Sequence, residues 1–213
     1  MLKRFVWSAI CMLPLQMVLA LGNNEIYYTT VNGEKMELKD EIAIGATILT
    51  NTYENGKGVI TFNAEVTNIQ RNAFRNNKEL KSIELPGSIT IINDYAFYNC
   101  SKLDSINIPD GVVSLGESAF DGCTNLSTVT VPNSVTYIGS ALFAGCENLT
   151  NLTIPTGVTS IGEFTFYGCS TLESISLPKV DHIGTSAFEG CIGLIKVETI
   201  DCDGNVSCLT FKK

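Results

Sequence analysis

The stretch LDSINIPDGVVSLGESAFDGC, from Leu103 to Cys123, is the unit that decides the fold. Its first part, Leu103-x-x-Ile106-x-Ile108, alternates apolar and polar residues, as a strand with one buried face does. Pro109 then ends ladder pairing, and the Asp-Gly pair that follows favours a turn. A second apolar stretch comes next. The closing Ala-Phe-x-Gly-Cys predicts one helical or 3₁₀ turn that drives its phenylalanine into the core.

This unit recurs along the chain at a step of 23 residues, and three columns of identical residues mark the period. They are the prolines Pro86, Pro109, Pro132, Pro155 and Pro178, the cysteines Cys100, Cys123, Cys146, Cys169 and Cys191, and the phenylalanines Phe74, Phe97, Phe120, Phe143, Phe166 and Phe188. One residue is missing between Pro178 and Ile183, so the last cysteine and phenylalanine come one position early. Six units then cover residues 58–194. Because one unit cannot bury its own apolar side, we expect a β-rich repeat solenoid with a parallel sheet along one wall.

The start of each unit resembles that of the leucine-rich repeat, L-x-x-L-x-L. The matching segments begin at Leu80, Leu126, Leu149 and Leu172. Because proline directly follows the strand and Ala-Phe-x-Gly-Cys comes later, the 23-residue variant resembles the BspA-type leucine-rich-repeat proteins of host-associated bacteria. The resemblance implies a right-handed curved leucine-rich-repeat array that is displayed or secreted and adheres to host or bacterial proteins. It implies no catalytic residues and no particular target.

The amino terminus has the layout of an export signal. Residues 1–22 predict a secretory signal peptide, because Lys3 and Arg4 precede a run from Phe5 to Leu21 that carries no charge. The run is short for a membrane span, so an uncleaved anchor is the less favoured alternative. We therefore expect a secreted or cell-surface protein, with no membrane insertion after cleavage.

Polar modules are expected at the two open ends of the solenoid, because each end would otherwise expose apolar surface and strand edges. Residues 23–57 predict an N-terminal β-hairpin cap, in which a strand over residues 26–31 leads into Asn32-Gly33, a strong hairpin signal. A second strand is expected over residues 47–53. Residues 195–213 would close the other end.

The charge balance narrows the class of partner. Without residues 1–22, 12 of the 14 Lys and Arg remain against all 22 Asp and Glu, which gives a net charge of −10. A chain this acidic lacks the basic surface that nucleic acids and anionic lipids require. Nucleic acid and membrane surfaces are therefore not expected as partners, and the family resemblance implies an extracellular or host protein instead.

The five column cysteines lie in one structural column, so their side chains are expected to point in parallel rather than toward each other. We predict a structural ladder of buried free thiols that act as small hydrophobic groups, with pairing of neighbouring cysteines as the alternative. Cys202 and Cys208 lie outside this column and flank a turn-forming Asp-Gly-Asn, so a disulfide between them is a candidate. No metal site is expected, because a linear column cannot readily place four thiolates around one ion.

Nothing in the sequence indicates catalysis. The single histidine, His182, lies in the shortened turn after Pro178 and is expected to be an exposed loop residue. No nucleophile elbow, phosphate-binding loop, dinucleotide glycine motif or metal-binding histidine pair occurs. We predict a non-enzymatic protein with no catalytic residue and no cofactor.

A binding surface can be placed from the repeat register. The outward positions of the predicted sheet are small, mostly neutral polar residues, and the candidate protein-binding residues there are Asn107, Thr128, Thr130, Asn151 and Thr153. Tyr137 belongs to a second strip of outward positions and is a further candidate, whereas Tyr98 and Tyr167 lie on another edge. The sheet positions lack the Trp, Tyr and Arg that dominate protein interfaces. The alternatives are therefore a structural spacer without a specific ligand, or a carbohydrate-binding module.

Overall fold

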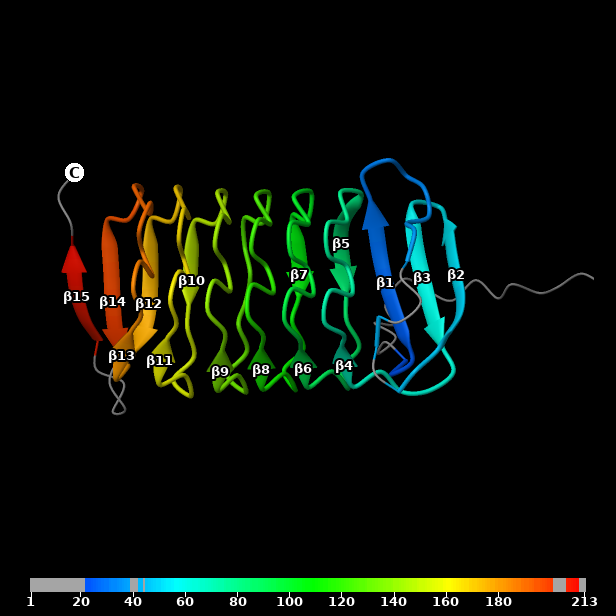
Figure 1. Ribbon diagram of the computed structural model, residues 1–213, viewed down its shortest axis with the longest axis horizontal. Helices are drawn as coiled ribbons and strands as arrows, with labels where there is room; N and C mark the ends of the chain where they lie inside the picture. The colour runs from blue at the N-terminus through cyan, green and yellow to red at the C-terminus, as the bar shows by residue number, and fades with distance from the viewer. Residues whose placement is uncertain (1–21, 39–41, 44, 201–205, 211–213) are drawn as a thin grey trace, which may run out of the picture.

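The computed structural model describes residues 22–38, 42–43, 45–200 and 206–210, and the expected repeat solenoid is confirmed (Figure 1). The signal peptide predicted over residues 1–22 lies almost entirely outside these residues. Successive 23-residue units stack as rungs along the long axis. We name each rung by its core phenylalanine, so that the Phe143 rung covers residues 126–148 and the Phe166 rung covers residues 149–171.

The first wall of the stack carries the L-x-x-L-x-L strands, whose alternating pattern buries every second residue. They are β5 (Leu80–Glu84), β7 (Ser105–Asn107), β10 (Asn151–Thr153), β12 (Ser174–Pro178) and β14 (Lys196–Ile200). Neighbouring strands pair in parallel with equivalent residues opposite one another, as in Glu84 with Asn107 and Thr153 with Ser176. The predicted register is therefore confirmed. We call the exposed surface of this wall the sheet face.

The second wall follows the proline turn and consists of two-residue strands. They are β4 (Asn68–Ile69), β6 (Ile91–Ile92), β8 (Ser114–Leu115), β9 (Tyr137–Ile138), β11 (Ser160–Ile161) and β13 (His182–Ile183). The second residue of each is buried in the core, except in the last strand, where Ile183 is exposed. The last four of these strands are each followed by a glycine, which lets rungs approach closely. A Cβ on Gly139 would lie 2.4 Å from the backbone nitrogen of Glu117, so a larger residue would push the rungs apart.

The Ala-Phe-x-Gly-Cys segments form the third side of each rung, which we call the turn edge. The helical or 3₁₀ turn predicted here is wrong, because no helix occurs among the described residues. The amides instead alternate between hydrogen bonds within the rung and hydrogen bonds to the next rung. Asp121 N–H donates to the Ser118 carbonyl three residues back, whereas Phe120 N–H donates to the Leu142 carbonyl in the next rung at 3.0 Å. Ser118 and Gly122 have positive φ, which turns alternate amides toward the neighbouring rung. Bonding between rungs therefore replaces helical bonding.

The core runs as one apolar cluster through all the rungs. Its centre is the phenylalanine column, in which neighbouring rings are nearly parallel and their centroids lie 5.1–6.2 Å apart. The rings from Phe97 to Phe166 are fully buried. Each ring packs against rungs on both sides, so the stack, rather than the single rung, is the stable unit.

Three strands extend the first wall at its N-terminal end, namely β1 (Glu25–Thr30), β2 (Ile48–Glu54) and β3 (Lys57–Phe62). The first two lie in the segment that the sequence predicts as a cap, and we use the word cap for all three. β2 and β3 form a hairpin through Asn55-Gly56, where both residues have positive φ, as a type I′ turn requires. β1 lies between β3 and β5 and pairs antiparallel with both.

The hairpin expected at Asn32-Gly33 does not form, because β1 finds its partners far along the chain rather than in the next segment. The first unit also begins differently from its expected strand, since β3 pairs with β1 and not with β5.

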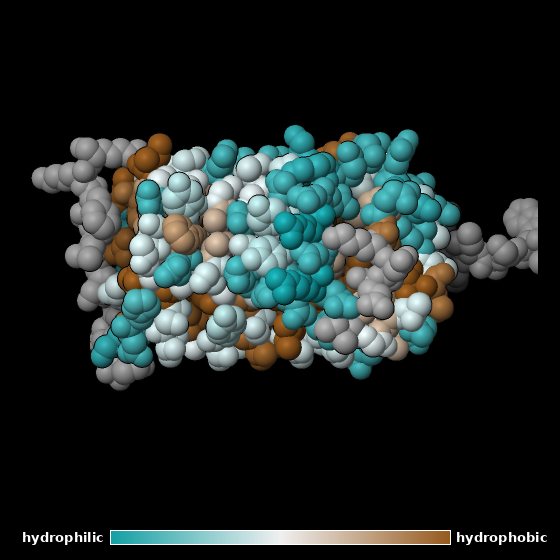
Figure 2. All heavy atoms as spheres, viewed as in Figure 1, coloured by the Kyte–Doolittle hydropathy of each residue, from teal (hydrophilic) through white to brown (hydrophobic). Residues whose placement is uncertain are grey.

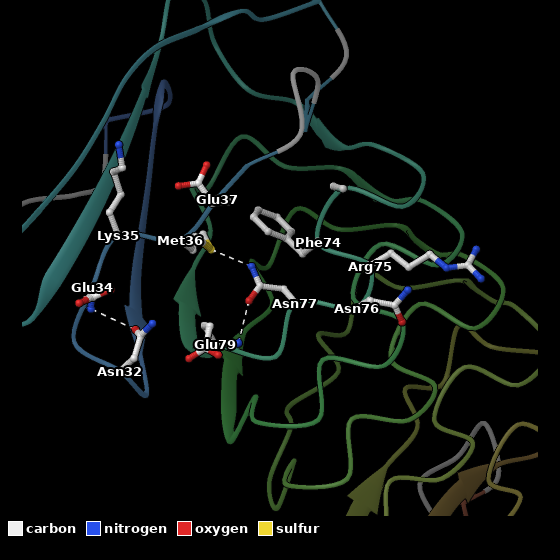
Figure 3. Close-up of a pocket in the computed structure, with 11 residues that line it drawn as sticks. Asn32, Glu34, Lys35, Met36, Glu37, Phe74, Arg75, Asn76, Asn77 and Glu79 are labelled. Carbon is white, nitrogen blue, oxygen red and sulfur yellow. Dashed lines mark hydrogen bonds between the residues drawn. The ribbon is translucent and has the colours of Figure 1, made fainter.

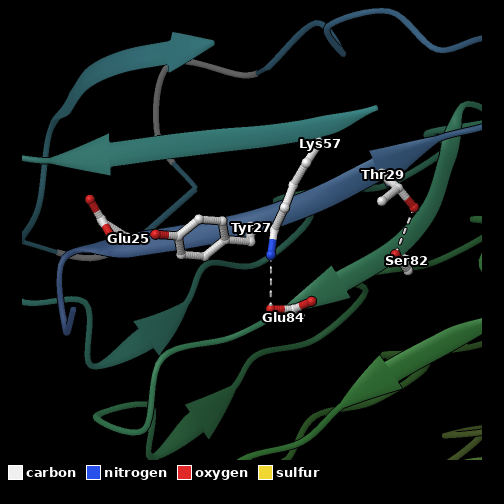
Figure 4. Close-up of polar contacts among 6 residues, drawn as sticks. All are labelled: Glu25, Tyr27, Thr29, Lys57, Ser82 and Glu84. Carbon is white, nitrogen blue, oxygen red and sulfur yellow. Dashed lines mark hydrogen bonds and ion pairs between the residues drawn. The ribbon is translucent and has the colours of Figure 1, made fainter. Parts of the chain in front are cut away.

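Side chains also join the cap to the first wall (Figure 4). Thr29 Oγ1 lies 2.7 Å from Ser82 Oγ, and Lys57 Nζ lies 3.5 Å from Glu84 Oε2 and 4.4 Å from the centre of the Tyr27 ring. The sheet face therefore continues from the rungs onto the cap.

At the opposite end, β15 (Val206–Thr210) pairs antiparallel with β14. Hydrophobic residues gather beside this end of the stack (Figure 2), where Ile183, Ile192 and Ile195 are exposed. No helix of the described residues is long and apolar enough to cross a membrane.

Candidate binding face and a seam between rungs

The structure places most of the predicted site residues on one surface. Asn107, Thr128, Thr130, Asn151 and Thr153 are all exposed on the sheet face. Tyr137 is 58% exposed but belongs to β9 on the second wall, next to Ser114 of β8. The sheet face and Tyr137 are therefore separate candidate sites.

The β-sheets of both walls are interrupted between the Phe143 and Phe166 rungs. On the first wall, residue Thr128 makes only an isolated bridge with Ser105, and a new sheet begins at β10. On the second wall, one sheet ends at β9 and the next begins at β11. We call this double interruption the seam.

Backbone hydrogen bonds that join other rungs are missing at the seam. Gly139 N–H donates to Leu115 and Gly184 N–H donates to Ile161, both at 2.8 Å, but Gly162 N–H has no backbone acceptor among the described residues. The turn edge stays bonded across the seam, since Phe143 N–H donates to Thr165 at 2.9 Å. The seam is thus closed at the turn edge and open on both walls.

Side-chain packing shows the same widening. The Phe143 and Phe166 rings lie 6.2 Å apart, compared with 5.1–5.6 Å at the other steps of the column. The inward residues of the Phe143 strand are Val129 and Val131, where neighbouring rungs have Ile or Leu. A missing methylene at each position leaves less side chain to fill the space between rungs.

A surface pocket of about 400 Å³ opens on the sheet face at the seam. Its lining includes the apolar side chains of Val129, Val131 and Leu152 and three of the predicted site residues, namely Thr130, Asn151 and Thr153. Asp110 and Asn133 add polar groups to the lining. An apolar surface bordered by a few polar groups is the usual composition of a binding pocket.

A second pocket, of about 420 Å³, lies where the cap meets the Phe74 rung (Figure 3). Its walls are held together by hydrogen bonds: Asn77 Nδ2 donates to Met36 Sδ at 3.2 Å, and Glu79 N–H donates to Asn77 Oδ1 at 3.0 Å. Arg75 lines this pocket, but its guanidinium points away from Met36 and Asn77. These contacts fasten the cap to the first rung, and we take this pocket as a structural joint.

The five column cysteines are free thiols in the structure, and the first four are fully buried. Each Sγ lies 3.0–3.3 Å from the carbonyl oxygen of a phenylalanine in the preceding rung, as in Cys146 with Phe120, so each thiol donates a hydrogen bond between rungs. Burial raises the pKa of the Cys123 and Cys146 thiols above its ordinary value and keeps these donors protonated.

The other chemistry-bearing residues are not brought together. The candidate disulfide would join Cys202 and Cys208. Cys202 lies outside the described residues, and only the backbone of Cys208 is described, on β15 opposite Glu198 of β14. His182 is exposed on β13. The described residues contain no group of three His, Cys, Asp or Glu that could hold a metal ion.

Comparison with known protein families identifies the repeat. A family model described as BspA type leucine rich repeat region matches six copies over residues 44–162 and 90–207. The chain belongs to the BspA-type leucine-rich-repeat family. No match was found among curated proteins.

Solved structures of leucine-rich-repeat proteins resemble this BspA-type chain. The T. pallidum leucine rich repeat protein is 30% identical, with a TM-score of 0.58, over 63% of this chain and 64% of that chain. A leucine rich cell surface protein from Faecalibacterium prausnitzii A2-165 is 28% identical, with a TM-score of 0.53, over 80% of this chain and 54% of that one. The BspA-type chain thus spans less than two thirds of either relative.

The apolar part of the seam pocket is not evident from the sequence of this BspA-type chain. The repeat register predicts that Val129, Val131 and Leu152 point into the core, and it does not indicate that they line a pocket. The available signal was the change from Ile or Leu to Val in two consecutive inward columns of one rung. Such a local loss of volume indicates looser packing at that step.

Proposed function

We propose that this protein is an exported, surface-displayed binding module without catalytic activity, and that its sheet face binds an extracellular protein at the seam pocket. The observation that carries the proposal is the pocket itself, whose lining combines apolar side chains with the polar side chains of Thr130, Asn151 and Thr153. A partner that inserts one apolar side chain there gains a desolvated central contact, as protein interfaces usually need.

Export is supported by the charge-free run that follows Lys3 and Arg4 in residues 1–22. The similar chain from Faecalibacterium prausnitzii, described as a leucine rich cell surface protein, points in the same direction. Display outside the cell would bring the sheet face into contact with extracellular proteins.

The composition of the face favours recognition by shape and polar contacts. Thr128, Thr130, Asn151 and Thr153 carry no charge, although the chain as a whole is acidic. Six rungs spaced about 4.8 Å apart span roughly 25 Å, which is enough for a standard contact of about 800 Å² per partner. We therefore expect binding with only modest salt dependence, because few charges are neutralised at the contact.

The test compares variants of the face with a variant elsewhere. The protein is immobilised and incubated with serum and extracellular matrix proteins, and the bound proteins are identified. Thr130→Arg combined with Thr153→Arg should abolish specific capture, because two long charged side chains would fill the pocket and bury charge. Glu189→Lys changes an exposed residue on the turn edge of the last rung and should leave capture unchanged. Equal capture by all three proteins would show that the seam pocket is not the site.

A further inference from the structure

The turn edge carries arginine and tyrosine side chains, which the sheet face of the rungs lacks. Arg71 and Arg75 are the only arginines outside residues 1–22, and both lie on the turn edge of the Phe74 rung. The Arg75 guanidinium is 4.8 Å from the centre of the Tyr98 ring and 5.4 Å from that of Tyr95, and Arg71 is 5.4 Å from Tyr95. Arginine and tyrosine are the residues that contribute most often to protein interfaces.

The cluster is held in one arrangement. The Tyr95 and Tyr98 rings pack edge to face with centroids 5.8 Å apart, and Tyr95 OH donates to Glu117 Oε1 at 2.5 Å. Arg75 Nη1 donates to Asn72 Oδ1 at 3.0 Å. A surface with restrained anchors loses less conformational entropy when it binds.

A second aromatic pair occupies the same two columns three rungs further along. Phe164 and Tyr167 pack edge to face with centroids 5.9 Å apart and are 42% and 44% exposed. Between the two pairs the columns hold only Ser118, Asp121, Ala141 and Ala144. The turn edge therefore presents two raised aromatic pairs with small residues between them.

The backbone indicates that these aromatics are not there for the fold. Tyr95 and Phe164 both have φ of 56°, a left-handed conformation that bulky residues rarely adopt. Ser118 and Ala141 occupy the same position in the intervening rungs with φ of 49° and 53°. The rung thus needs only a small residue here, and strained aromatics at exposed positions are typical of ligand-contacting sites.

The chemistry of the cluster selects the kind of partner. A guanidinium on an otherwise acidic protein attracts a carboxylate, which it binds through paired hydrogen bonds. Arg71 and Arg75 already lie against the Tyr95 and Tyr98 rings, so these rings have little free face on which a sugar could stack. Phe164 has no hydroxyl and favours an apolar side chain. A protein segment satisfies all of these requirements.

The spacing fixes the pattern of that segment. Arg75 lies one rung before the Tyr95 and Tyr98 pair. Four rungs at about 4.8 Å therefore separate it from Phe164 and Tyr167 by about 19 Å, and an extended chain covers that distance in about six residues. In an extended segment, residues six apart point to the same side. We propose that the turn edge is a second docking surface, separate from the seam, for an extended protein segment with an acidic residue on Arg75 and an apolar residue, six positions away, on Phe164 and Tyr167. Asp121, between the pairs, accepts a backbone N–H of the segment.

The test is a selection from a displayed library of random nine-residue peptides, run on the wild-type protein and on Arg75→Gln. Peptides enriched on the wild type should share Asp or Glu six positions from a large apolar residue, in either order, and should not be enriched on Arg75→Gln. A spacing of five serves as an internal control, because it puts the two side chains on opposite sides of an extended segment.

A synthetic copy of the most enriched peptide then separates the two ends of the surface. Its dissociation constant should rise at least about tenfold on Arg75→Gln and on Tyr167→Ser, as loss of an interface anchor does. Arg75→Lys should restore part of the affinity, and Thr153→Arg, on the sheet face, should change nothing. Unfolding midpoints of the variants, measured in parallel, confirm that each is folded.

Three results would overturn the proposal. The first is enrichment of the same peptides on Arg75→Gln. The second is a set of enriched peptides whose binding is lost on Thr153→Arg instead. The third is a selection without enrichment, together with binding to an acidic oligosaccharide array that depends on Arg75. The last result would assign the surface to glycans. Capture at the seam is measured separately, so the two surfaces stand or fall independently.

Discussion

At the scale of single residues, the column cysteines are hydrogen-bond donors as well as core side chains. Cys123 Sγ lies 3.2 Å from the Phe97 carbonyl oxygen, and Cys146 Sγ lies 3.3 Å from that of Phe120. The same Phe120 oxygen also accepts the N–H of Cys123. The Cys146 thiol therefore donates to the second lone pair of this oxygen, which the apolar surroundings would otherwise leave unpaired. Alanine would fill part of the space but could not donate.

These thiols should make the protein less stable at alkaline pH. The folded-state pKa of Cys123 and Cys146 is raised by burial, whereas in the unfolded chain a thiol titrates near 8.5. Below that pH both states are protonated and stability is complete. Above it the unfolded chain loses protons that the folded chain keeps, so the free energy of unfolding should fall by about 1.4 kcal/mol per pH unit for each such thiol.

Urea unfolding between pH 7.5 and 9.5, with a reductant present, measures this slope. Cys123→Ala should lower stability at every pH but show a shallower slope than the wild type, because one titrating thiol is gone. Equal slopes would mean that the buried thiols are not the groups responsible.

At the scale of elements, the seam follows from the size of two side chains. Val129 is partly buried and packs loosely, whereas Ile106 and Leu152 in the neighbouring rungs are buried. Because parallel ladders need rungs held at a constant spacing, a rung with less inward volume loses its hydrogen-bonding register with the next rung.

Filling that volume should therefore stabilise the protein. Val129→Ile restores the methylene that the column has elsewhere, and we expect it to raise the free energy of unfolding by about 0.5–1.5 kcal/mol. Val112→Ile is the matched control, because Val112 is fully buried and precedes β8, which pairs with the strands on both sides, and overpacking there should cost about 1–3 kcal/mol. Denaturation midpoints of the two variants decide the question, and a loss of stability in both would show that the seam has no space to fill.

The sequence predicted the strands, their register and the outward residues, because period-two alternation and the 23-residue step leave little freedom. It failed at the turn edge, where Ala119-Phe120 has helical character locally but its amides find acceptors in the next rung. It also failed at Asn32-Gly33, where a good hairpin signal was overruled by pairing of β1 with β3 and β5. Both errors come from contacts between distant residues, which local patterns do not report.

The candidate site was predicted in part. Thr130, Asn151 and Thr153 were found from register alone, but the pocket between them depends on packing at Val129 and could not be foreseen. The clustering of Arg75 with Tyr95 and Tyr98 likewise needs the geometry of two adjacent rungs.

At the scale of the whole molecule, the seam divides the stack into two blocks that share the turn edge. In a repeat solenoid each rung contacts only its neighbours, so stability is close to a sum of rung and interface contributions. The seam interface lacks ladder bonds that the other interfaces have, and we expect it to be the weakest.

Hydrogen exchange should therefore show two cooperative units that meet at the seam. The amide of Gly162 should exchange much faster than those of Gly139 and Gly184, which are bonded to the preceding rung. Amides before residue 146 and after residue 165 should reach separate maximum protection levels. One common level across all rungs, with Gly162 protected like its equivalents, would contradict this division.

The turn-edge hydrogen bonds also give the stack a polarity along its long axis. In each rung before the last, the bonding amides of this edge donate toward the C-terminal side, as Gly122 does to Ala144 and Gly145 does to Tyr167. In the last rung, the N–H groups of Ser186, Phe188 and Gly190 have no backbone acceptor among the described residues. Two such ends brought together would set donors against donors on this edge. Whatever stacks there must offer hydrogen-bond acceptors, so on this edge two copies of the molecule would match head to tail and not through two identical ends.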